Sequence, residues 1–207
     1  DHEDVFYYIT LMNENYTHPD MPEGVEQDIL KGMYLLKAGG KGDKKVQLMG
    51  SGTILQEVIA GAELLKADFG VEADIWSCPS FNLLHRDAIE VERYNRLHPL
   101  EENKLPFVTS QLQGHEGPVV AATDYVRSFA DRIRAYIPND YHVLGTDGFG
   151  RSDSRANLRR FFEVDRYNVA VAALSALAEQ GKVSKETVQQ AIEKYGINAD
   201  VAPSWKR

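Results

Sequence analysis

Several features that define common functional classes are rare or missing in this sequence. Cys78 is its only cysteine, so an internal disulfide and a zinc site built from cysteine pairs are both excluded. No apolar run approaches the roughly 20 residues that a transmembrane helix needs, and the first residues show no signal-peptide pattern. The 31 Asp and Glu exceed the 23 Lys and Arg, and the resulting charge of −8 argues against non-specific binding to nucleic acid or anionic membranes. We therefore expect a soluble cytoplasmic protein with neither nucleic-acid nor membrane partners.

The sequence motifs of common catalytic and metal sites are also missing. The six histidines show no HxH or HExxH spacing, and the chain has neither a GxSxG elbow nor a GxxxxGK[ST] phosphate loop. His85 and Asp87 lie close together in sequence, but neighbouring positions of a helix point in different directions. We expect no metal site and no self-contained catalytic group in this chain.

From residue 46 onward, strand-like runs alternate with amphipathic helical patterns. The first helix is expected to begin with a capping box formed by Thr53 and Gln56, and Asp124 is expected to cap the helix after the third strand. Such alternation predicts βαβ units and an α/β fold, namely a three-layer α/β/α arrangement with a mostly parallel sheet. The expected strands are residues 46–49, 73–78, 119–123 and 141–146, and the expected helices are 53–69, 85–97, 124–137, 155–162, 165–178 and 184–195.

The first 45 residues follow a different pattern. Residues 5–13 are aromatic and β-branched, as in a strand, but linker-type residues follow them and a partner strand is not apparent nearby. We interpret residues 1–16 as the remnant strand of a preceding domain, 17–45 as an interdomain connection with a short helix over 26–36, and 46–207 as the main domain. An ordinary edge strand of this domain is the alternative for residues 5–13. Because the sequence begins with Asp1, we expect it to be a piece of a longer protein.

Two glycine turns, the first at residues 50–53 and the second at residues 149–153, are candidates for binding an anion. Both precede helices, whose free N–H groups attract negative charge. We favour an interpretation of both as turns with helix caps, and an anion site is the alternative. Arg151, Arg155, Arg159 and Arg160 beside the second turn are expected to be solvated or paired with Glu163 and Asp165. The candidate anion-binding residues are Gly50, Ser51, Gly52, Thr53, Gly150 and Ser152.

Three long segments carry a family resemblance. They are VQLMGSGTILQEVIAGAELLKADFGVEADIWSCPSFNLLHRD from residue 46, PVVAATDYVRSFADRIRAYIP from residue 118 and GTDGFGRSDSRANLRRFFEVDRYNVAVAAL from residue 145. Together they resemble the C-terminal domain of the transketolase-like thiamin diphosphate enzymes. Within that family, VFYYITLMNENYTHPDMPEG, ERYNRLHPLE and YHVLGTDGFGRSDSRANLRRFFEVD resemble the homodimeric bacterial decarboxylating (first) component of pyruvate dehydrogenase. The tail at 201–207 departs from the family pattern.

The resemblance implies a homodimeric parent enzyme that decarboxylates pyruvate and passes the two-carbon unit to a lipoyl group of the acyltransferase component. It also implies that thiamin diphosphate and magnesium lie between two other domains, and that residues 5–13 end the pyrimidine-binding domain. Asp147-Gly148 begins like the family's diphosphate motif, but the Asn pair that should follow is missing from residues 170–178. No catalytic, cofactor-binding or metal-binding residue of the family can therefore be assigned here.

A structural role in support of the dimer is the function that we expect for this domain, and the isolated chain is expected to be inactive. Two alternatives remain open. One is a regulatory module that binds an anion or a nucleotide. The other is a domain that docks a partner, in this or another 2-oxo acid dehydrogenase or in a transketolase.

Overall fold

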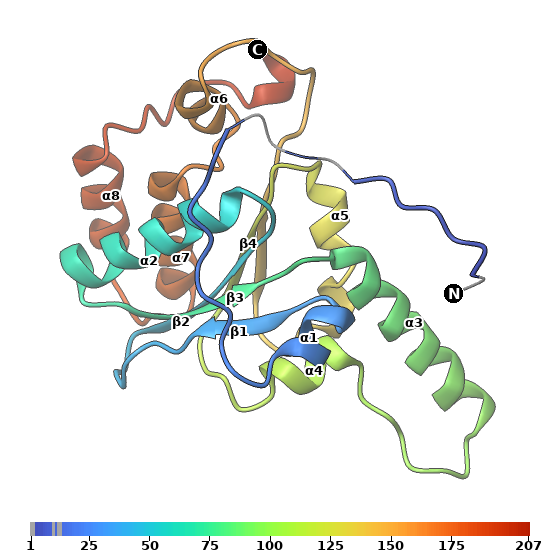
Figure 1. Cartoon of the computed structure of the whole chain (residues 1–207). Helices are drawn as coiled ribbons and strands as arrows, with labels where there is room; N and C mark the ends of the chain where they lie inside the picture. Colours follow the sequence, from blue (N-terminus) through green and yellow to red (C-terminus); the bar gives the residue numbers. More distant parts are fainter. Residues whose placement is uncertain (1–2, 10, 12–13) are drawn as a thin grey trace.

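A five-stranded sheet forms the centre of the computed structural model, which describes residues 3–9, 11 and 14–207 (Figure 1). Its strand order is β1-β3-β2-β4-β5. Strands β2 to β5 pair in parallel, and β1 pairs antiparallel with β3 at the edge. The strands are β1 (Tyr34–Lys37), β2 (Lys45–Gly50), β3 (Glu72–Ser77), β4 (Val119–Ala122) and β5 (Tyr141–Leu144). The predicted α/β class with a mostly parallel sheet is confirmed.

Helices cover both faces of the sheet. Alternate strand residues point to opposite faces, so Leu48 packs in the core beneath α2, α7 and α8, whereas Met49 packs in the core beneath α3, α4 and α5 (Figure 1). The described helices are α1 (Glu26–Lys31), α2 (Ile54–Phe69), α3 (Phe81–Leu97), α4 (Phe107–Leu112), α5 (Arg127–Asp131), α6 (Arg155–Phe161), α7 (Arg166–Glu179) and α8 (Lys185–Lys194), with 3-10 turns at Arg134–Tyr136 and Ser204–Lys206. Among the residues that the structure describes, no helix is long and apolar enough to cross a membrane.

Local signals in the sequence explain where several helices begin and end. The hydroxyl of Ser154 accepts a hydrogen bond from the N–H of Asn157, and the Asp165 carboxylate accepts one from the N–H of Asn168. These side chains satisfy donors that the first helical turn leaves free. Gly70 ends α2 in a left-handed conformation with φ of 63°, as glycine at this position predicts.

The N-terminal part of the chain differs from its prediction. The helix expected over residues 26–36 ends at Lys31, because Gly32 turns the chain with φ of 107° and the next residues pair with β3 as strand β1. In the segment expected to be a strand, the described residues 5–9 and 11 form none, and residues 10, 12 and 13 lie outside the described part. The division at 1–16, 17–45 and 46–207 stays a prediction, although β1 belongs to the same sheet as the later strands.

Two predicted helix caps are wrong. Thr53 has helical backbone angles (φ −71°, ψ −18°), so its side chain does not form the capping box with Gln56. Asp124 does not cap the helix after β4 because that helix, α5, begins only at Arg127, whose N–H donates to the Asp147 carboxylate at 3.1 Å. The loop after β5 contacts the chain before α5, where the N–H of Thr146 donates to the carbonyl of Tyr125.

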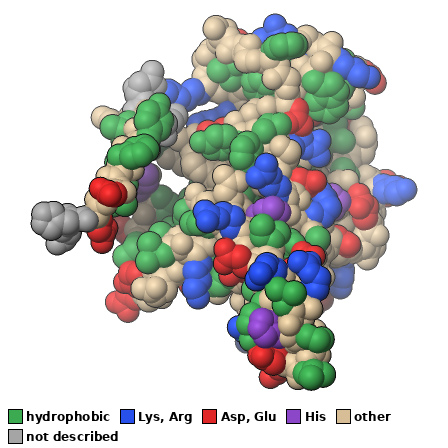
Figure 2. Space-filling view, turned by 90° about the vertical axis from the view of Figure 1, so that its right-hand side faces the viewer, with side chains coloured by type: hydrophobic (Ala, Val, Ile, Leu, Met, Phe, Trp, Pro, Cys, Tyr) green, Lys and Arg blue, Asp and Glu red, His purple; other side chains and the backbone are tan. Residues whose placement is uncertain are grey.

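Charged groups of both signs are mixed on the face that α3 presents. Figure 2 shows Lys and Arg side chains interspersed with Asp and Glu there, with hydrophobic groups scattered between them. The N-terminal segment stands away from the body of the molecule, and its Phe6 and Tyr8 side chains are about nine-tenths exposed (93% and 89%). Exposed aromatic side chains of this kind are typical of surfaces that another chain segment covers.

Candidate functional site

The order of the strands creates a crevice at the carboxyl ends of β2 and β4. After β2 the chain passes through α2 on one face of the sheet, whereas after β4 it enters α5 on the other face. The two neighbouring strands therefore send their following loops in opposite directions. In doubly wound sheets this switch point is where ligands bind.

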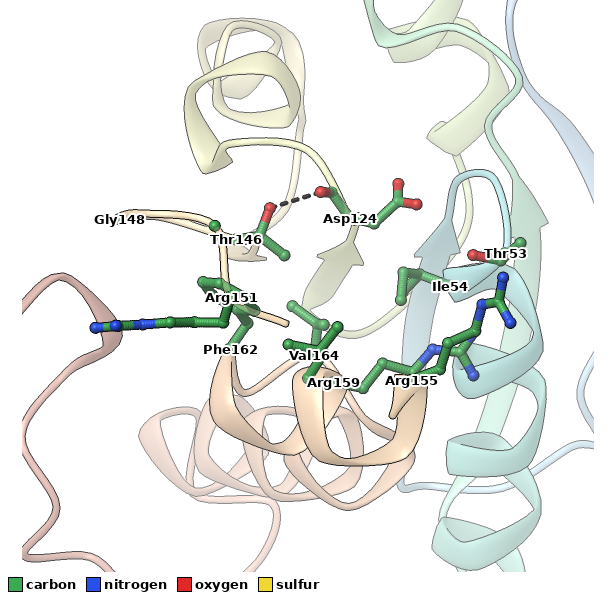
Figure 3. A pocket seen from close by; sticks show the side chains of 12 residues that line it. Thr53, Ile54, Asp124, Thr146, Gly148, Arg151, Arg155, Arg159, Phe162 and Val164 are labelled. Atoms are coloured by element: carbon green, nitrogen blue, oxygen red, sulfur yellow. Dashed lines mark hydrogen bonds between the residues drawn. The ribbon is translucent and has the colours of Figure 1, made fainter. Parts of the chain in front are cut away.

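A pocket of about 320 Å³ occupies this crevice (Figure 3). Its floor is apolar, with Ile54 and Val164 fully buried and Leu158 and Phe162 half-buried. The loops after β2, β4 and β5 and helix α6 supply the rest of the wall. The remaining lining residues are Thr53, Asp124, Thr146, Gly148, Gly150, Arg151, Arg155 and Arg159.

Asp124 is the acidic group of the pocket. Figure 3 shows that its carboxylate lies above the apolar floor, while its backbone carbonyl accepts a hydrogen bond from the Thr146 hydroxyl at 2.5 Å. Although the side chain keeps an exposed side, surrounding protein atoms displace enough water to raise the pKa of Asp124. Its own backbone N–H and the positive charge of Arg159 act in the opposite direction without cancelling this rise. Asp124 is therefore a hydrogen-bonding group whose charge is only partly stabilised.

The buried Glu57 of α2 fixes the position of Arg159. Its carboxylate lies 2.9 Å from Nη1 of Arg159 and accepts hydrogen bonds from the backbone N–H (2.9 Å) and Nε (3.0 Å) of Arg166. Burial alone would raise the pKa of Glu57, but the bonds from Arg166 and the charges of both arginines outweigh burial and lower it. Glu57 therefore stays ionised and links α2 to α6 and α7.

The arginines next to the second glycine turn have identifiable partners. Arg160 pairs with Asp165 at 3.3 Å, which confirms that part of the expectation. Glu163 pairs with Arg207 instead, at 3.2 Å. Arg155 contacts Glu14, and Arg151 lies over the Phe161 ring at 5.5 Å.

The structure separates the six candidate anion-binding residues. Thr53 and Gly150 line the pocket, and Ser152 is exposed outside the lining. Ser51 is buried, and its hydroxyl donates to the Thr123 hydroxyl at 2.8 Å. A Cβ at Gly50 would come within 2.7 Å of the Leu55 Cα, so a close approach of β2 and α2 accounts for that glycine. Gly52 lies beside Asp124, with 3.6 Å between its built Cβ position and Oδ1.

Sequence reasoning missed the roles of Asp124 and Glu57. A signal for Asp124 existed, because an acidic residue directly after a parallel strand lies at the ligand-binding edge of a sheet. Glu57 offered no such signal, since its partners Arg159 and Arg166 are 102 and 109 residues away. Among the described residues, no group of three or more His, Cys, Asp and Glu is placed to hold a metal ion.

Comparison with known proteins places this chain in a family. Residues 32–165 match the model of the transketolase-like TK C-terminal domain. The chain belongs to this family. It is 57% identical over 198 residues to the pyruvate dehydrogenase E1 component of Cupriavidus necator, and 52% identical over 201 residues to that of Escherichia coli K12. These matches cover 95% and 96% of this chain but only 22% of each relative, so the chain spans about a fifth of their length.

A solved structure of transketolase from Pichia stipitis, a variant in complex with xylulose 5-phosphate, is similar in fold. It is 18% identical, with a TM-score of 0.50 over 75% of this chain and 19% of the transketolase chain. At that identity the likeness concerns the fold alone. It agrees with the parallel sheet and its helical layers.

Proposed function

We propose that this chain is the C-terminal domain of a pyruvate dehydrogenase E1 component, the enzyme that decarboxylates pyruvate with thiamin diphosphate and magnesium. The observation that carries this proposal is the identity of 52–57% along 95–96% of the chain with proteins of that name. The parent enzyme would be a cytoplasmic homodimer that acetylates the lipoyl group of an acyltransferase component.

The domain itself is proposed to support the dimer rather than to hold the cofactor. The one stretch that resembles a diphosphate motif, Asp147-Gly148, is engaged in the fold: the Asp147 carboxylate accepts from the N–H of Arg127, and its carbonyl accepts from the Ser204 hydroxyl at 2.6 Å. A magnesium ion on a diphosphate requires several oxygen ligands, and among the described residues Asp147 belongs to no group of three or more His, Cys, Asp and Glu placed to hold a metal ion. These residues do not fit the cofactor, so we assign no catalytic step to this chain.

The test of the parent activity uses the complete protein encoded by the gene. We expect it to be several times longer than 207 residues, to release carbon dioxide from pyruvate only with thiamin diphosphate and magnesium, and to acetylate a purified lipoyl domain. A reading frame of about 207 codons would overturn the proposal. So would a full-length protein that is inactive with pyruvate but active with another 2-oxo acid or a ketose phosphate.

The supporting role is tested with the 207-residue chain alone. Calorimetric titration with thiamin diphosphate and magnesium is expected to show no binding heat. Tight, magnesium-dependent binding to this chain would contradict the assignment of the cofactor to other domains, even if the full-length enzyme decarboxylates pyruvate.

A further inference from the structure

We propose that the pocket at the carboxyl ends of β2 and β4 binds a small organic anion, with an apolar body on the pocket floor and a phosphate or carboxylate group at Arg155 and Arg159. This proposal is independent of the function proposed above. It concerns a site that lies wholly within the chain and needs no other domain.

The place and size of the pocket suit a small ligand. It opens where the strand order reverses, which is the position that ligands take in sheets of this kind. Its volume of about 320 Å³ lies at the lower end of the range of roughly 300–1,000 Å³ for small-molecule sites. The nearby Gly150 leaves space, since no described atom lies within 4 Å of a Cβ built on it.

The floor of the pocket offers a surface for an apolar group. Ile54 comes from the start of α2, Leu158 and Phe162 from α6 and the residue after it, and Val164 from the connection to α7. Figure 3 shows Ile54, Phe162 and Val164 below the loops after β4 and β5. A ring or short chain placed there would remove apolar surface from water, at roughly 25 cal/mol per Å².

Arginines are the groups of the lining that would hold an anion. Three arginines and one aspartate line the pocket, and two carboxylates outside the lining, Glu57 and Glu14, pair with Arg159 and Arg155. Figure 3 shows the side chains of Arg155 and Arg159 lying together on the α2 side, whereas Arg151 points away from them. Arg159 is already oriented by the buried Glu57, so little conformational freedom is lost when a ligand binds it.

A carboxylate already occupies part of this position. Glu14 contacts Arg155, and its side chain is half exposed (50%). The contact shows that a carboxylate can reach the Arg155 guanidinium. A ligand anion would compete with Glu14 for this guanidinium. Removing the Glu14 carboxylate by substitution is therefore expected to raise the affinity for the ligand rather than lower it.

Hydrogen-bond acceptors lie on the same side of the pocket as Arg155 and Arg159. Figure 3 shows the Thr53 side chain close to the ends of these two arginines, and the charge of Arg159 also acts on the Asp124 carboxylate. Desolvation raises the pKa of Asp124, so a ligand hydroxyl or amine that donates to it would offset part of its lost hydration. The site thus favours a ligand that carries a hydrogen-bond donor near its anionic group, in addition to an apolar body.

Binding is tested on the 207-residue chain with four probes that separate the two parts of this ligand. Phenyl phosphate and benzoate carry both an apolar ring and an anion, inorganic phosphate carries the anion alone, and benzyl alcohol carries the ring without charge. We expect phenyl phosphate or benzoate to bind in a one-to-one ratio and at least tenfold more tightly than the other two probes, by calorimetry and by NMR shifts at Thr53 and Gly150. Whichever of phenyl phosphate and benzoate binds more tightly shows whether the site prefers a phosphate or a carboxylate.

Three variants, each of which changes the net charge by one unit, locate the site. Arg155→Gln is expected to weaken binding about tenfold, a typical effect of losing one charged hydrogen bond. Glu14→Gln is expected to tighten it about threefold by removing the competing carboxylate. Arg93→Gln, on the exposed face of α3, is the matched control and is expected to leave the affinity unchanged.

Specific outcomes would overturn the proposal. These are an absence of saturable binding by either ring-bearing anion, an equal affinity for benzyl alcohol and phenyl phosphate, or equal losses in Arg155→Gln and Arg93→Gln. Melting curves confirm that each variant is folded before its affinity is compared. A negative result in these binding experiments would not change the outcome of the pyruvate decarboxylation assay on the full-length protein. A negative decarboxylation assay would likewise leave the binding result unchanged.

Discussion

The two ends of the parallel sheet carry similar charged and polar side chains, but these are arranged differently. At the amino end, charged and amide groups close into a buried network, whereas at the carboxyl end arginines and an aspartate surround an open pocket. A charged cluster therefore does not define a binding site by itself. The space that the neighbouring backbone leaves open makes the difference.

Asp74 is the centre of the amino-end network. Its side chain is only 1% exposed and accepts from the N–H of Gly39 (2.7 Å) and from Nε2 of Gln47 (3.0 Å). Lys45 and His115 also reach this carboxylate, at 3.1 and 2.9 Å. Both oxygens of the buried carboxylate are hydrogen-bonded, Oδ1 by Gly39 and Oδ2 by the other three groups, and a protein tolerates a buried charge when it is bonded in this way.

Backbone packing closes the amino end. A Cβ built on Gly117 would lie 1.9 Å from the carbonyl oxygen of Lys45, so the loop before β4 presses directly on the start of β2. At Gly150, in the loop after β5, the same construction finds no described atom within 4 Å. Tight loops fill one end of the sheet, and wider loops leave the pocket at the other.

The largest expected effect is at the closed end. Asp74→Ala would remove the acceptor of the half-buried Gly39 N–H and one of the two acceptors of the buried Gln47 amide, so we expect a loss of about 3 kcal/mol in the free energy of unfolding. Urea denaturation followed by circular dichroism measures it. A loss below about 1 kcal/mol would show that water replaces the carboxylate and that this end is not closed.

Glu57→Ala tests the corresponding carboxylate at the open end. Glu57 is buried, but its partner Arg166 is 44% exposed and can be rehydrated, so we expect a smaller loss of about 2 kcal/mol. The same denaturation experiment gives the value. If the loss equals or exceeds that of Asp74→Ala, the contrast between the two ends does not hold for stability.

Acid titration of stability sharpens the comparison at the closed end. Burial acts to raise the pKa of Asp74, but hydrogen bonds from His115, Gly39, Gln47 and Lys45 outweigh it, so the folded-state pKa lies below the unfolded value of about 3.9. This stabilisation is present above the unfolded pKa and is lost as the pH falls towards the folded one, with a slope of at most about 1.4 kcal/mol per pH unit. Asp74→Asn, which keeps the shape, is expected to show a shallower loss of unfolding free energy below pH 4. An unchanged slope would contradict this.

Ser51→Ala is expected to have the smallest effect. It removes the hydroxyl pair between Ser51 and Thr123 and should cost about 1 kcal/mol in unfolding free energy. Because the Ser51 hydroxyl points to Thr123 and not into the pocket, the affinity for phenyl phosphate or benzoate should not change. A tenfold loss of affinity would show that Ser51 belongs to the binding site, as the alternative interpretation of the first glycine turn as an anion site predicts.

The regular part of the chain was predictable because its signals are local. Periodicity located β2 to β5, and Ser154, Asp165 and Gly70 mark helix ends through bonds or backbone angles within a few residues. The cap assigned to Asp124 was wrong because a distant loop decides the backbone there: Asp147, not Asp124, accepts from the first turn of α5. The cap assigned to Thr53 was wrong because the backbone angles of Thr53 are helical and its side chain makes no cap bond. Strand β1 was not predicted, because its residues continue a helical pattern in the sequence and only the pairing with β3 makes them a strand.

The candidate site was only partly predictable for the same reason. The sequence identified two glycine turns at the correct edge, and it identified the arginines of α6. It contained no information on which residues face the pocket, because that depends on contacts such as the one between Glu57 and Arg159 across 102 residues.

The sequence by itself determined the α/β class, the order of most strands and helices and the family resemblance, because periodicity, caps and long motifs are properties of neighbouring residues. Tertiary structure alone decided that one end of the sheet is closed around Asp74 and the other is open beside Asp124. The physical reason is packing: whether polar groups meet each other or enclose space depends on how closely loops from distant parts of the chain approach.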